Sequence, residues 1–226
     1  MSSKRFKKAA ELIDPLKVYT LDEALPLLKQ TSTTKFDSSV EVHVRLGIDP
    51  SKAEQTVRST AQLPHSTGKK LRIAVFAKGP AAAAATKAGA AMVGDDELIA
   101  EVKKTGAIAA DIVLATPDMM KSLAPVAKTL GTKGLMPNPK NETVTADPAA
   151  MIKALETGKI SFRSDANGNV HQLIGKISAS PEQLKENIVA FIDALKKAKP
   201  ATQKGTYIKN LVVCSAMGPS IRIQEV

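Results

Sequence analysis

Hydrophobic and polar positions near the start of the chain predict a helix followed by a strand. Thr20 and Glu23 have the spacing of a capping box, and apolar residues then recur at helical spacing to about Gln30. Over residues 40–46 valine or leucine alternates with polar residues, which is the period-two pattern of a strand with one wet face. A helix packed against a half-buried strand is the arrangement that these patterns favour.

The pattern changes after about residue 70, where short continuous apolar runs alternate with helical patterns. Each expected strand precedes a helix: 72–77 before a helix that ends near Gly89, 92–93 before 95–104, and 111–115 before 117–130. Short buried strands separated by helices are typical of a parallel sheet that is covered on both faces. The middle of the chain therefore resembles a small Rossmann-like unit.

In the last third of the chain the pattern again predicts antiparallel strands. A turn at Asn167-Gly168 between two apolar runs predicts a β-hairpin. Ser180-Pro181 begins a long amphipathic helix, which Lys199-Pro200 ends. The elements expected here are a loop at 131–143, a helix at 148–156, strands at 160–163 and 170–177, the long helix, and strands at 207–213 and 221–223.

These patterns predict a two-domain protein that combines the α+β and α/β classes. Helix and antiparallel strands lie on both sides of the α/β insert. We therefore expect one discontinuous, split α+β domain from residues 1–67 and 159–226, and an inserted Rossmann-like domain from residues 68–158. The chain has 226 residues, of which 43% are hydrophobic and 24% charged, so it is long and apolar enough to fold as two small domains.

Charge narrows the class of partner. The net charge is +10, of which the two end segments carry +7, so the split domain is the expected site for a phosphate polymer. Surface lysines that only maintain solubility would give the same bias. Aromatic residues make up 3% of the chain and tryptophan is absent, which disfavours a platform for stacked bases. Nucleic acid would therefore be recognised through its backbone and shape.

Cysteine usage and hydropathy indicate where the protein works. The single cysteine, Cys214, excludes an internal disulfide framework and is interpreted as a small apolar residue in a reducing compartment. The basic N-terminal segment is not followed by an apolar run, and no stretch approaches a membrane helix in length. We therefore expect a cytoplasmic protein that contacts no membrane.

Enzyme chemistry finds little support in the motifs. A nucleotide-binding enzyme that uses the α/β insert is the main alternative, but no glycine-rich phosphate loop or nucleophile elbow is present. His43, His65 and His171 are far apart in the sequence and have no second ligand at metal spacing. His43 lies on the polar side of its expected strand, where it would be solvated. We expect no catalytic residue, no cofactor and no metal.

Two segments resist a purely structural interpretation. Residues 131–140 (GTKGLMPNPK) contain two glycines, two prolines and two lysines, which predicts a loop more rigid than a linker requires. Residues 215–220 (SAMGPS) join two expected strands through a glycine-proline step, which would expose backbone N–H groups and the Met217 side chain. A β-turn with Met217 in the core fits the same residues, and both interpretations remain open.

Several short motifs follow one another in a specific order along nearly the whole chain. They are KFD at 35–37 with VEVH at 40–43, LGIDP at 46–50, LPH at 63–65 with GK at 68–69, GLMPNPK at 134–140, FR at 162–163 with Asp165, GK at 175–176 and MGPS at 217–220. In these motifs the chain closely resembles the L-one family of large-ribosomal-subunit proteins, in its bacterial form. The resemblance implies a split α+β domain and a Rossmann-like insert joined by a hinge.

The same resemblance implies a function and a set of partners. It implies a non-catalytic constituent of the large ribosomal subunit that binds large-subunit ribosomal RNA at the mobile stalk near the tRNA exit site. Such a protein would assist release of deacylated tRNA and repress translation of its own mRNA. The expected partners are therefore that RNA, exit-site tRNA and its own mRNA, and the protein would be monomeric off a bacterial or organellar ribosome.

Carried over by position, the resemblance also implies the residues that contact RNA. They are Lys35, Phe36, Ser39, Glu41, Arg163, Asp165, His171, Lys176, Met217 and Gly218. The lysines and the arginine would contact phosphates, and the phenylalanine and methionine would contact sugar or base faces. Ser39, Glu41 and the Gly218 backbone would bind 2′-hydroxyl groups, unless Glu41 is only a structural partner of a nearby basic residue.

Three positions depart from the pattern of the family. Ala216 stands where threonine is usual, and Ala166 replaces a common lysine, so two individual contacts are in doubt. Ser59 replaces a glycine, which raises a question about the hinge because serine adopts positive φ less readily than glycine.

A DNA-binding or general chromosomal protein is the second alternative, and it would bind RNA and DNA of one shape equally well.

Overall fold

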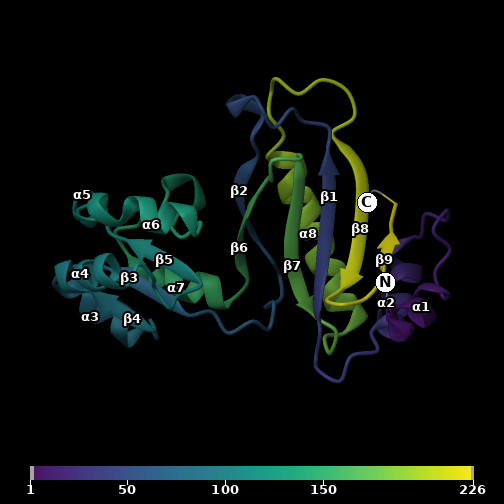
Figure 1. The fold of residues 1–226 in the computed structure, drawn as a ribbon, viewed down its shortest axis with the longest axis horizontal. Coiled ribbons are helices and arrows are strands. Elements are labelled where there is room, and N and C mark those ends of the chain that lie inside the picture. Colours follow the sequence, from purple (N-terminus) through teal and green to yellow (C-terminus); the bar gives the residue numbers. More distant parts are fainter. Residues whose placement is uncertain (1–2, 225–226) are drawn as a thin grey trace. The chain divides into compact units, whose positions relative to one another are not determined.

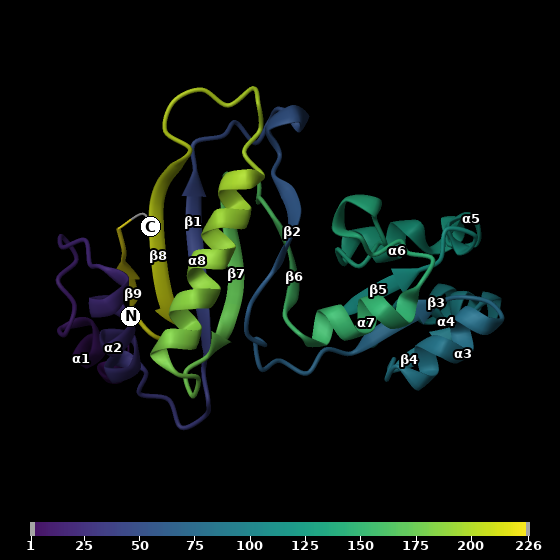
Figure 2. The same ribbon diagram turned by 180° about the vertical axis from the view of Figure 1, so that it is seen from behind.

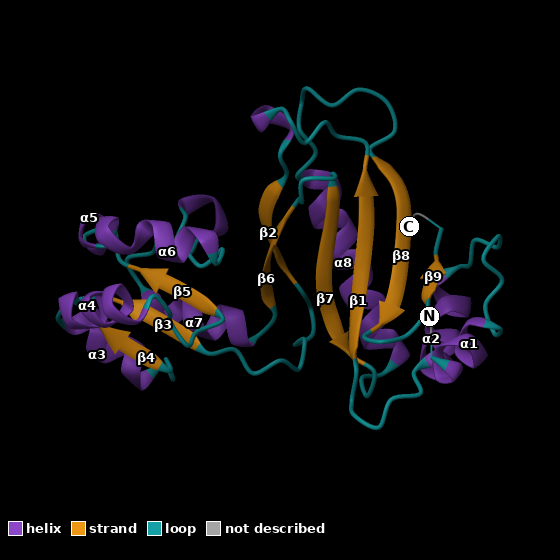
Figure 3. Cartoon of the chain, in the orientation of Figure 1, coloured by secondary structure: helices purple, strands orange, loops and turns teal. Residues whose placement is uncertain are grey.

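The computed structural model describes residues 3–224, and contacts within the chain gather into two compact units. Unit 1 combines Met1–Lys69 with Ile160–Val226, and unit 2 is Lys70–Lys159. Helices and strands occur in both units (Figures 1 and 3), which agrees with the mixed α and β class expected from the sequence. Across residues 3–224, the structure has no helix with the length and apolar character needed to cross a bilayer.

Unit 1 contains a four-stranded antiparallel sheet in the order β7-β1-β8-β9. The strands are β1 (Ser39–Leu46), β7 (Asn169–Lys176), β8 (Ile208–Ser215) and β9 (Ser220–Arg222). The alternation expected for β1 is present, because Val40, Val42 and Val44 are fully buried while the residues between them face the other side. Residues from both chain ends thus meet in one sheet.

Helices cover only one face of this sheet. Figure 2 shows α8 (Pro181–Lys197) lying across β1, β7 and β8, and Figure 1 views the opposite face, which no helix of unit 1 covers. Helix α2 (Leu21–Thr31) packs against α8, and the short helix α1 (Lys4–Ala10) packs against α2. Both long helices begin with a capping box: the one on Thr20 is predicted from the sequence, and the one on Ser180 lies where the sequence predicts only the start of a helix. We call the uncovered side the open face.

The expected hairpin after residue 160 is wrong. Strand β6 (Lys159–Arg163) pairs with β2 (Arg58–Gln62) in a separate two-stranded sheet, whereas β7 joins β1. The turn itself is present, since the Gly168 N–H donates to the Asp165 carbonyl at 3.2 Å, but only a single bridge, Ser164 to Val170, links the two arms.

The departure at Ser59 raises no geometric difficulty. Ser59 lies inside β2, and within the described chain the only non-glycine residues with positive φ are Glu142 and Met217. A serine is therefore accommodated at this position in ordinary extended backbone.

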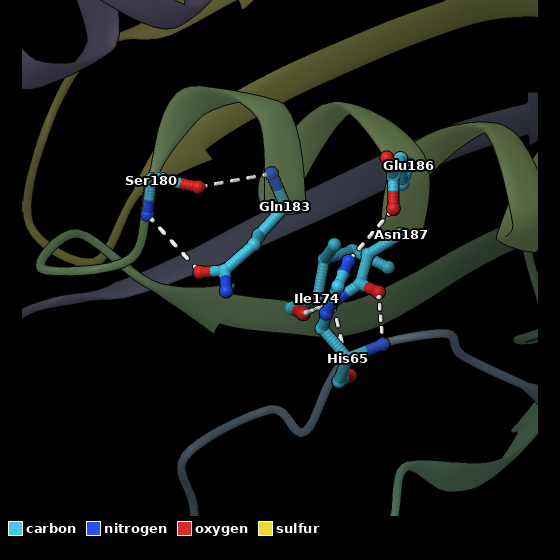
Figure 4. Close-up of polar contacts among 6 residues, drawn as sticks. All are labelled: His65, Ile174, Ser180, Gln183, Glu186 and Asn187. Carbon is cyan, nitrogen blue, oxygen red and sulfur yellow. Dashed lines mark hydrogen bonds and ion pairs between the residues drawn. The ribbon is translucent and has the colours of Figure 1, made fainter.

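Strand β2 leads into a segment that is anchored to α8 (Figure 4). The buried Asn187 side chain accepts from the His65 N–H at 2.9 Å and donates to the His65 carbonyl at 3.1 Å and the Ile174 carbonyl at 3.0 Å. His65 also faces Glu186, with His65 Nε2 2.7 Å from a carboxylate oxygen. One helix residue thus joins two segments that are far apart in the sequence.

Unit 2 contains the expected parallel sheet, in the order β4-β3-β5. Its strands are β3 (Ile73–Phe76), β4 (Met92–Gly94) and β5 (Ile112–Ala115), and its main helices are α3 (Pro80–Lys87), α4 (Asp96–Thr105) and α7 (Pro148–Glu156). One apolar core includes Phe76 and Val102, and a second includes Val75 and Ile152. Both faces of the sheet are therefore covered, as the apolar runs predict.

The single helix expected at residues 117–130 is wrong. The segment consists of α5 (Met119–Ser122), a 3₁₀ turn (Ala124–Val126) and α6 (Ala127–Thr132). Pro125 interrupts the helix because proline lacks a backbone N–H and its ring clashes with the preceding turn. The loop that follows is shorter than expected, since α6 includes Gly131 and a 3₁₀ turn forms at Pro139–Asn141.

Candidate nucleic-acid interface

Several of the expected RNA-contacting residues meet at one end of the unit 1 sheet, where β1 begins and β7 and β8 end. We call this place the rim, and define it as residues 35–39, Lys176 and residues 215–218. Lys176 Nζ donates to the Asp37 carbonyl and to Ser39 Oγ, each at 3.3 Å. The N–H of Ala216 donates to the Ser39 carbonyl at 2.8 Å. These contacts hold three chain segments together.

The rim presents apolar as well as basic groups to solvent. Phe36 is 58% exposed and Met217 is 70% exposed, and Lys35 beside them is exposed too. The alternative that placed Met217 in the core is therefore wrong. Exposed large apolar side chains next to an exposed lysine suit a surface that contacts sugar or base faces as well as phosphates.

The turn between β8 and β9 has a tight geometry that explains its sequence. Met217 has φ of 67°, in the left-handed region that a side chain with a Cβ adopts at a cost. A Cβ on Gly218 would lie 2.2 Å from Ser215 Oγ, so only glycine fits there. The Gly218 N–H donates to the Ser215 carbonyl at 2.8 Å and is used inside the turn. Gly218 thus shapes the turn rather than offering this N–H to a ligand.

The N-terminal helix contributes to the rim, which the sequence analysis did not foresee. Arg5 Nη2 donates to the Met217 carbonyl at 3.2 Å, and Arg5 Nη1 lies 3.4 Å from Thr33 Oγ1. The basic run at residues 4–8 was used only to reject a secretion signal. Ser3, which caps α1 by accepting from the Phe6 N–H, was the available clue that a helix begins there.

A polar cluster occupies the middle of the open face. The imidazoles of His43 and His171 lie opposite each other on β1 and β7, with Nδ1 atoms 2.7 Å apart. His43 Nε2 lies 3.1 Å from Cys214 Sγ and 3.7 Å from a Glu41 carboxylate oxygen. The expectation that the histidines are scattered and that His43 is merely solvated is wrong, because strand pairing joins residues that are far apart in the sequence.

Burial sets the charge state of this cluster. Desolvation lowers the pKa of His43, and the nearby charge of His171 lowers it further, while Glu41 acts in the opposite direction. Burial raises the pKa of the Cys214 thiol to about 11, with a further contribution from Glu41. At neutral pH His43 and Cys214 are therefore both uncharged.

Two further expected residues lie around the turn between β6 and β7. Burial alone would raise the pKa of Asp165, but its carboxylate accepts from the N–H groups of Asn169 and Asn167, and the net shift is downward. Asp165 is thus first a structural residue that holds the turn. Arg163 is exposed beside Arg58, whose pKa is lowered by burial and then by Arg163.

Arg163 and Asp165 border a shallow hollow of about 520 Å³. It is lined by Pro50, Thr56, Arg163, Ser164, Asp165 and Ala166. Ala166, one of the positions where the sequence departs from the expected family pattern, is part of this lining.

The structure therefore divides the expected residues into three groups. The rim holds Lys35, Phe36, Ser39, Lys176, Met217 and Gly218, the open face holds Glu41 and His171, and the turn holds Arg163 and Asp165. Lys176 ends β7, whereas Asp165 precedes the start of that strand, so the two lie in different groups. The residues that sequence reasoning missed are Arg5, His43, Arg58 and Cys214, because only strand pairing and an N-terminal helix bring them to these places.

Comparison with known proteins gives a family and several close relatives. Residues 28–219 match the ribosomal protein L1p/L10e family. A protein of Fervidobacterium nodosum named large ribosomal subunit protein uL1 is 48% identical over 221 residues, which cover 98% of this chain and 94% of that protein. Proteins of the same name from Kosmotoga olearia (46% over 223 residues; 99% and 96% covered) and Thermobifida fusca (48% over 221; 98% and 94%) are similarly close.

Proposed function

The chain belongs to the ribosomal protein L1p/L10e family, and from this premise we propose that it binds large-subunit ribosomal RNA as a constituent of the large ribosomal subunit. Family membership confirms the resemblance that the motifs indicated. It also confirms the expectation of a structural protein rather than an enzyme, so the nucleotide-binding enzyme is no longer an alternative.

The rim is the observation that carries the RNA-binding part of this proposal. It combines the exposed Lys35, Phe36 and Met217 with the polar groups of Ser39 and Lys176 on one end of a rigid sheet. A surface of this kind can pair a phosphate, contact a ribose or base face and hydrogen-bond a 2′-hydroxyl at the same time. The end segments also carry most of the net positive charge.

The other two groups extend the proposed contact area. Burial lowers the pKa of Arg58 and the nearby positive charge of Arg163 lowers it further, and a phosphate between the two guanidinium groups would relieve their repulsion. On the open face Glu41 offers an acceptor to hydroxyl or base edges, and the exposed His171 ring lies on the same face. Asp165 supports this area by holding the turn.

Salt dependence of RNA binding tests the phosphate contacts. We expect the Lys35→Gln variant to bind a structured fragment of large-subunit ribosomal RNA more weakly, whatever the sequence of the fragment. The slope of log affinity against log salt concentration should fall in magnitude by about 0.7–0.9, because one phosphate contact is lost. Lys185→Gln is the matched control, because Lys185 has the same charge but lies on α8 and pairs with Asp22. Equal losses in the two variants would show only a net-charge effect.

The apolar part of the rim has its own test. Met217→Asp places a carboxylate at an exposed position, so it should leave the melting temperature nearly unchanged and reduce RNA affinity by tenfold or more, about 1.4 kcal/mol. Filter binding and a thermal melt measure the two quantities. Unchanged affinity would remove this turn from the interface, and equal affinity for DNA of the same shape would favour the chromosomal-protein alternative.

Finer aspects of the function are proposed on the family resemblance. We place the protein on the mobile stalk near the tRNA exit site, where it assists release of deacylated tRNA, and we assign it repression of its own mRNA and a monomeric state off the ribosome. We also propose that residues 1–67 with 159–226 act as the RNA-binding domain. Translation of a reporter that carries its own mRNA leader, with and without added protein, tests the repression.

A further inference from the structure

We propose that Glu41, His43 and Cys214 form a binding site for a divalent cation of the zinc type on the open face of unit 1. One ligand atom of each residue, a carboxylate oxygen, an imidazole nitrogen and the sulfur, lies within 4.8 Å of the others. Mixed oxygen, nitrogen and sulfur donors of this kind suit Zn²⁺ better than Mg²⁺ or Ca²⁺. The inference goes beyond RNA binding and does not depend on it.

Strand pairing explains why these three residues converge. Glu41 and His43 are two residues apart on β1 and therefore face the same side of the sheet. Cys214 on β8 lies directly opposite Glu41 in the register. The sequence spacing that argued against a metal could not reveal this, because the third ligand comes from a strand far along the chain.

The distances in the cluster are close to those of a metal site. Tetrahedral zinc with ordinary bond lengths places neighbouring nitrogen, oxygen and sulfur ligands roughly 3.3–3.6 Å apart. His43 Nε2 lies 3.1 Å from Cys214 Sγ and 3.7 Å from Glu41 Oε2. Small side-chain rotations would therefore bring the three donors around one ion, and the thiol would lose its proton to solvent on binding.

His171 and Asp165 lie behind His43 and orient its imidazole toward the proposed metal position. His43 Nδ1 lies 2.7 Å from His171 Nδ1, and His171 Nε2 lies 3.6 Å from an Asp165 carboxylate oxygen. In the tautomer that binds a metal, His43 Nδ1–H donates to His171 Nδ1, and His171 Nε2–H faces Asp165. The lone pair of His43 Nε2 then points at Cys214 and Glu41. A carboxylate behind a ligating histidine is a recurrent feature of metal sites, here with His171 between them.

The site is half-buried and open on one side. The side chains of His43 and Glu41 are 30% and 37% exposed, and Cys214 is partly buried. Three protein ligands therefore leave the fourth position of a tetrahedron to water or to an oxygen or nitrogen of a bound molecule. The burial that remains keeps competing water away from the sulfur.

Cobalt substitution tests the proposal on the full-length protein without RNA. After treatment with a chelator, the protein should bind one equivalent of Co²⁺ with a sulfur-to-cobalt charge-transfer band in the near ultraviolet, and Zn²⁺ should abolish the band. Cys214→Ser should lose the band, and His171→Asn should weaken binding by about 10–100-fold, as removal of a supporting residue does. His65→Gln is the control, since His65 lies away from the cluster on Asn187 and Glu186.

Further measurements keep the result decisive if a variant fails to fold. X-ray absorption on the zinc-loaded native protein should show one sulfur neighbour at about 2.3 Å. A native protein without the sulfur neighbour or the cobalt band, or a folded Cys214→Ser variant that binds Zn²⁺ as tightly as the native protein, would overturn the site. These assays contain no RNA, so their failure leaves the proposed RNA function untouched, and a failure of RNA binding leaves the metal result standing.

Discussion

At the scale of single residues, the backbone at Met217 is the feature that most directly links conformation to the proposed RNA contact. Its φ of 67° is costly for a residue with a side chain, by about 1 kcal/mol, and its side chain nevertheless remains 70% exposed. An exposed apolar side chain held in unfavourable backbone is not explained by packing within the protein. It is explained if the side chain contacts RNA.

Met217→Gly separates these two effects. Glycine adopts positive φ freely, so the substitution removes strain and stabilises the folded state. Glycine also raises the entropy of the unfolded chain, which destabilises the folded state. The two effects should nearly cancel, and the free energy of unfolding should change by less than about 1 kcal/mol. RNA affinity should still fall, because the apolar side chain is gone. Urea denaturation measures the free energy of unfolding, and filter binding measures the RNA affinity. A variant that binds RNA as well as the native protein would assign the strain to the turn alone.

Residues also show the limit of reasoning from sequence. An exposed Met217 was one of two interpretations of residues 215–220, because the sequence of so short a turn does not determine whether a side chain faces the core. The cluster of Glu41, His43, His171 and Cys214 had no signal at all, because its members are separated by up to most of the chain and meet only through the pairing of β1 with β7 and β8.

At the scale of elements, α8 does more than cover the sheet, because Asn187 joins the segment after β2 to β7 through three hydrogen bonds. Asn187→Ala should lower the free energy of unfolding by about 2–4 kcal/mol, since it leaves buried backbone groups without partners. His65→Gln is the control and should cost at most about 1 kcal/mol, because its contact with Glu186 is exposed. Equal effects in denaturant titrations would contradict this account.

Elements with local signals were predicted well from the sequence, and those that depend on distant partners were not. The capping boxes at Thr20 and Ser180 and the alternation in β1 specify their own structure. The hairpin after β6 failed because a turn motif fixes the turn but not which strand edge each arm pairs with. The helix at 117–130 failed because the effect of Pro125 was underestimated.

At the scale of the whole molecule, the apolar core of unit 1 contains residues of the two chain ends only. Its members run from Tyr19 to Leu63 and from Phe162 to Ile223, and none comes from unit 2. Because this core includes no residue of unit 2, we expect it to form without the insert. The split domain was predicted from the change in the hydrophobic pattern near residue 70, and it stays a prediction that separation of the two parts tests.

A protein in which residues 1–67 are joined to 159–226 by a short flexible linker should consequently fold on its own. We expect one cooperative unfolding transition and RNA affinity within about tenfold of the full chain, because the rim, the open face and the Arg163 turn are all retained. Residues 70–159 alone, with their separate cores around Phe76 and Val75, should fold but bind the RNA weakly. Calorimetry of both pieces and filter binding decide the matter. Insert binding as tight as that of the joined ends would show that the charge of the end segments misled us, and a joined protein that fails to fold would show that the core needs unit 2 after all.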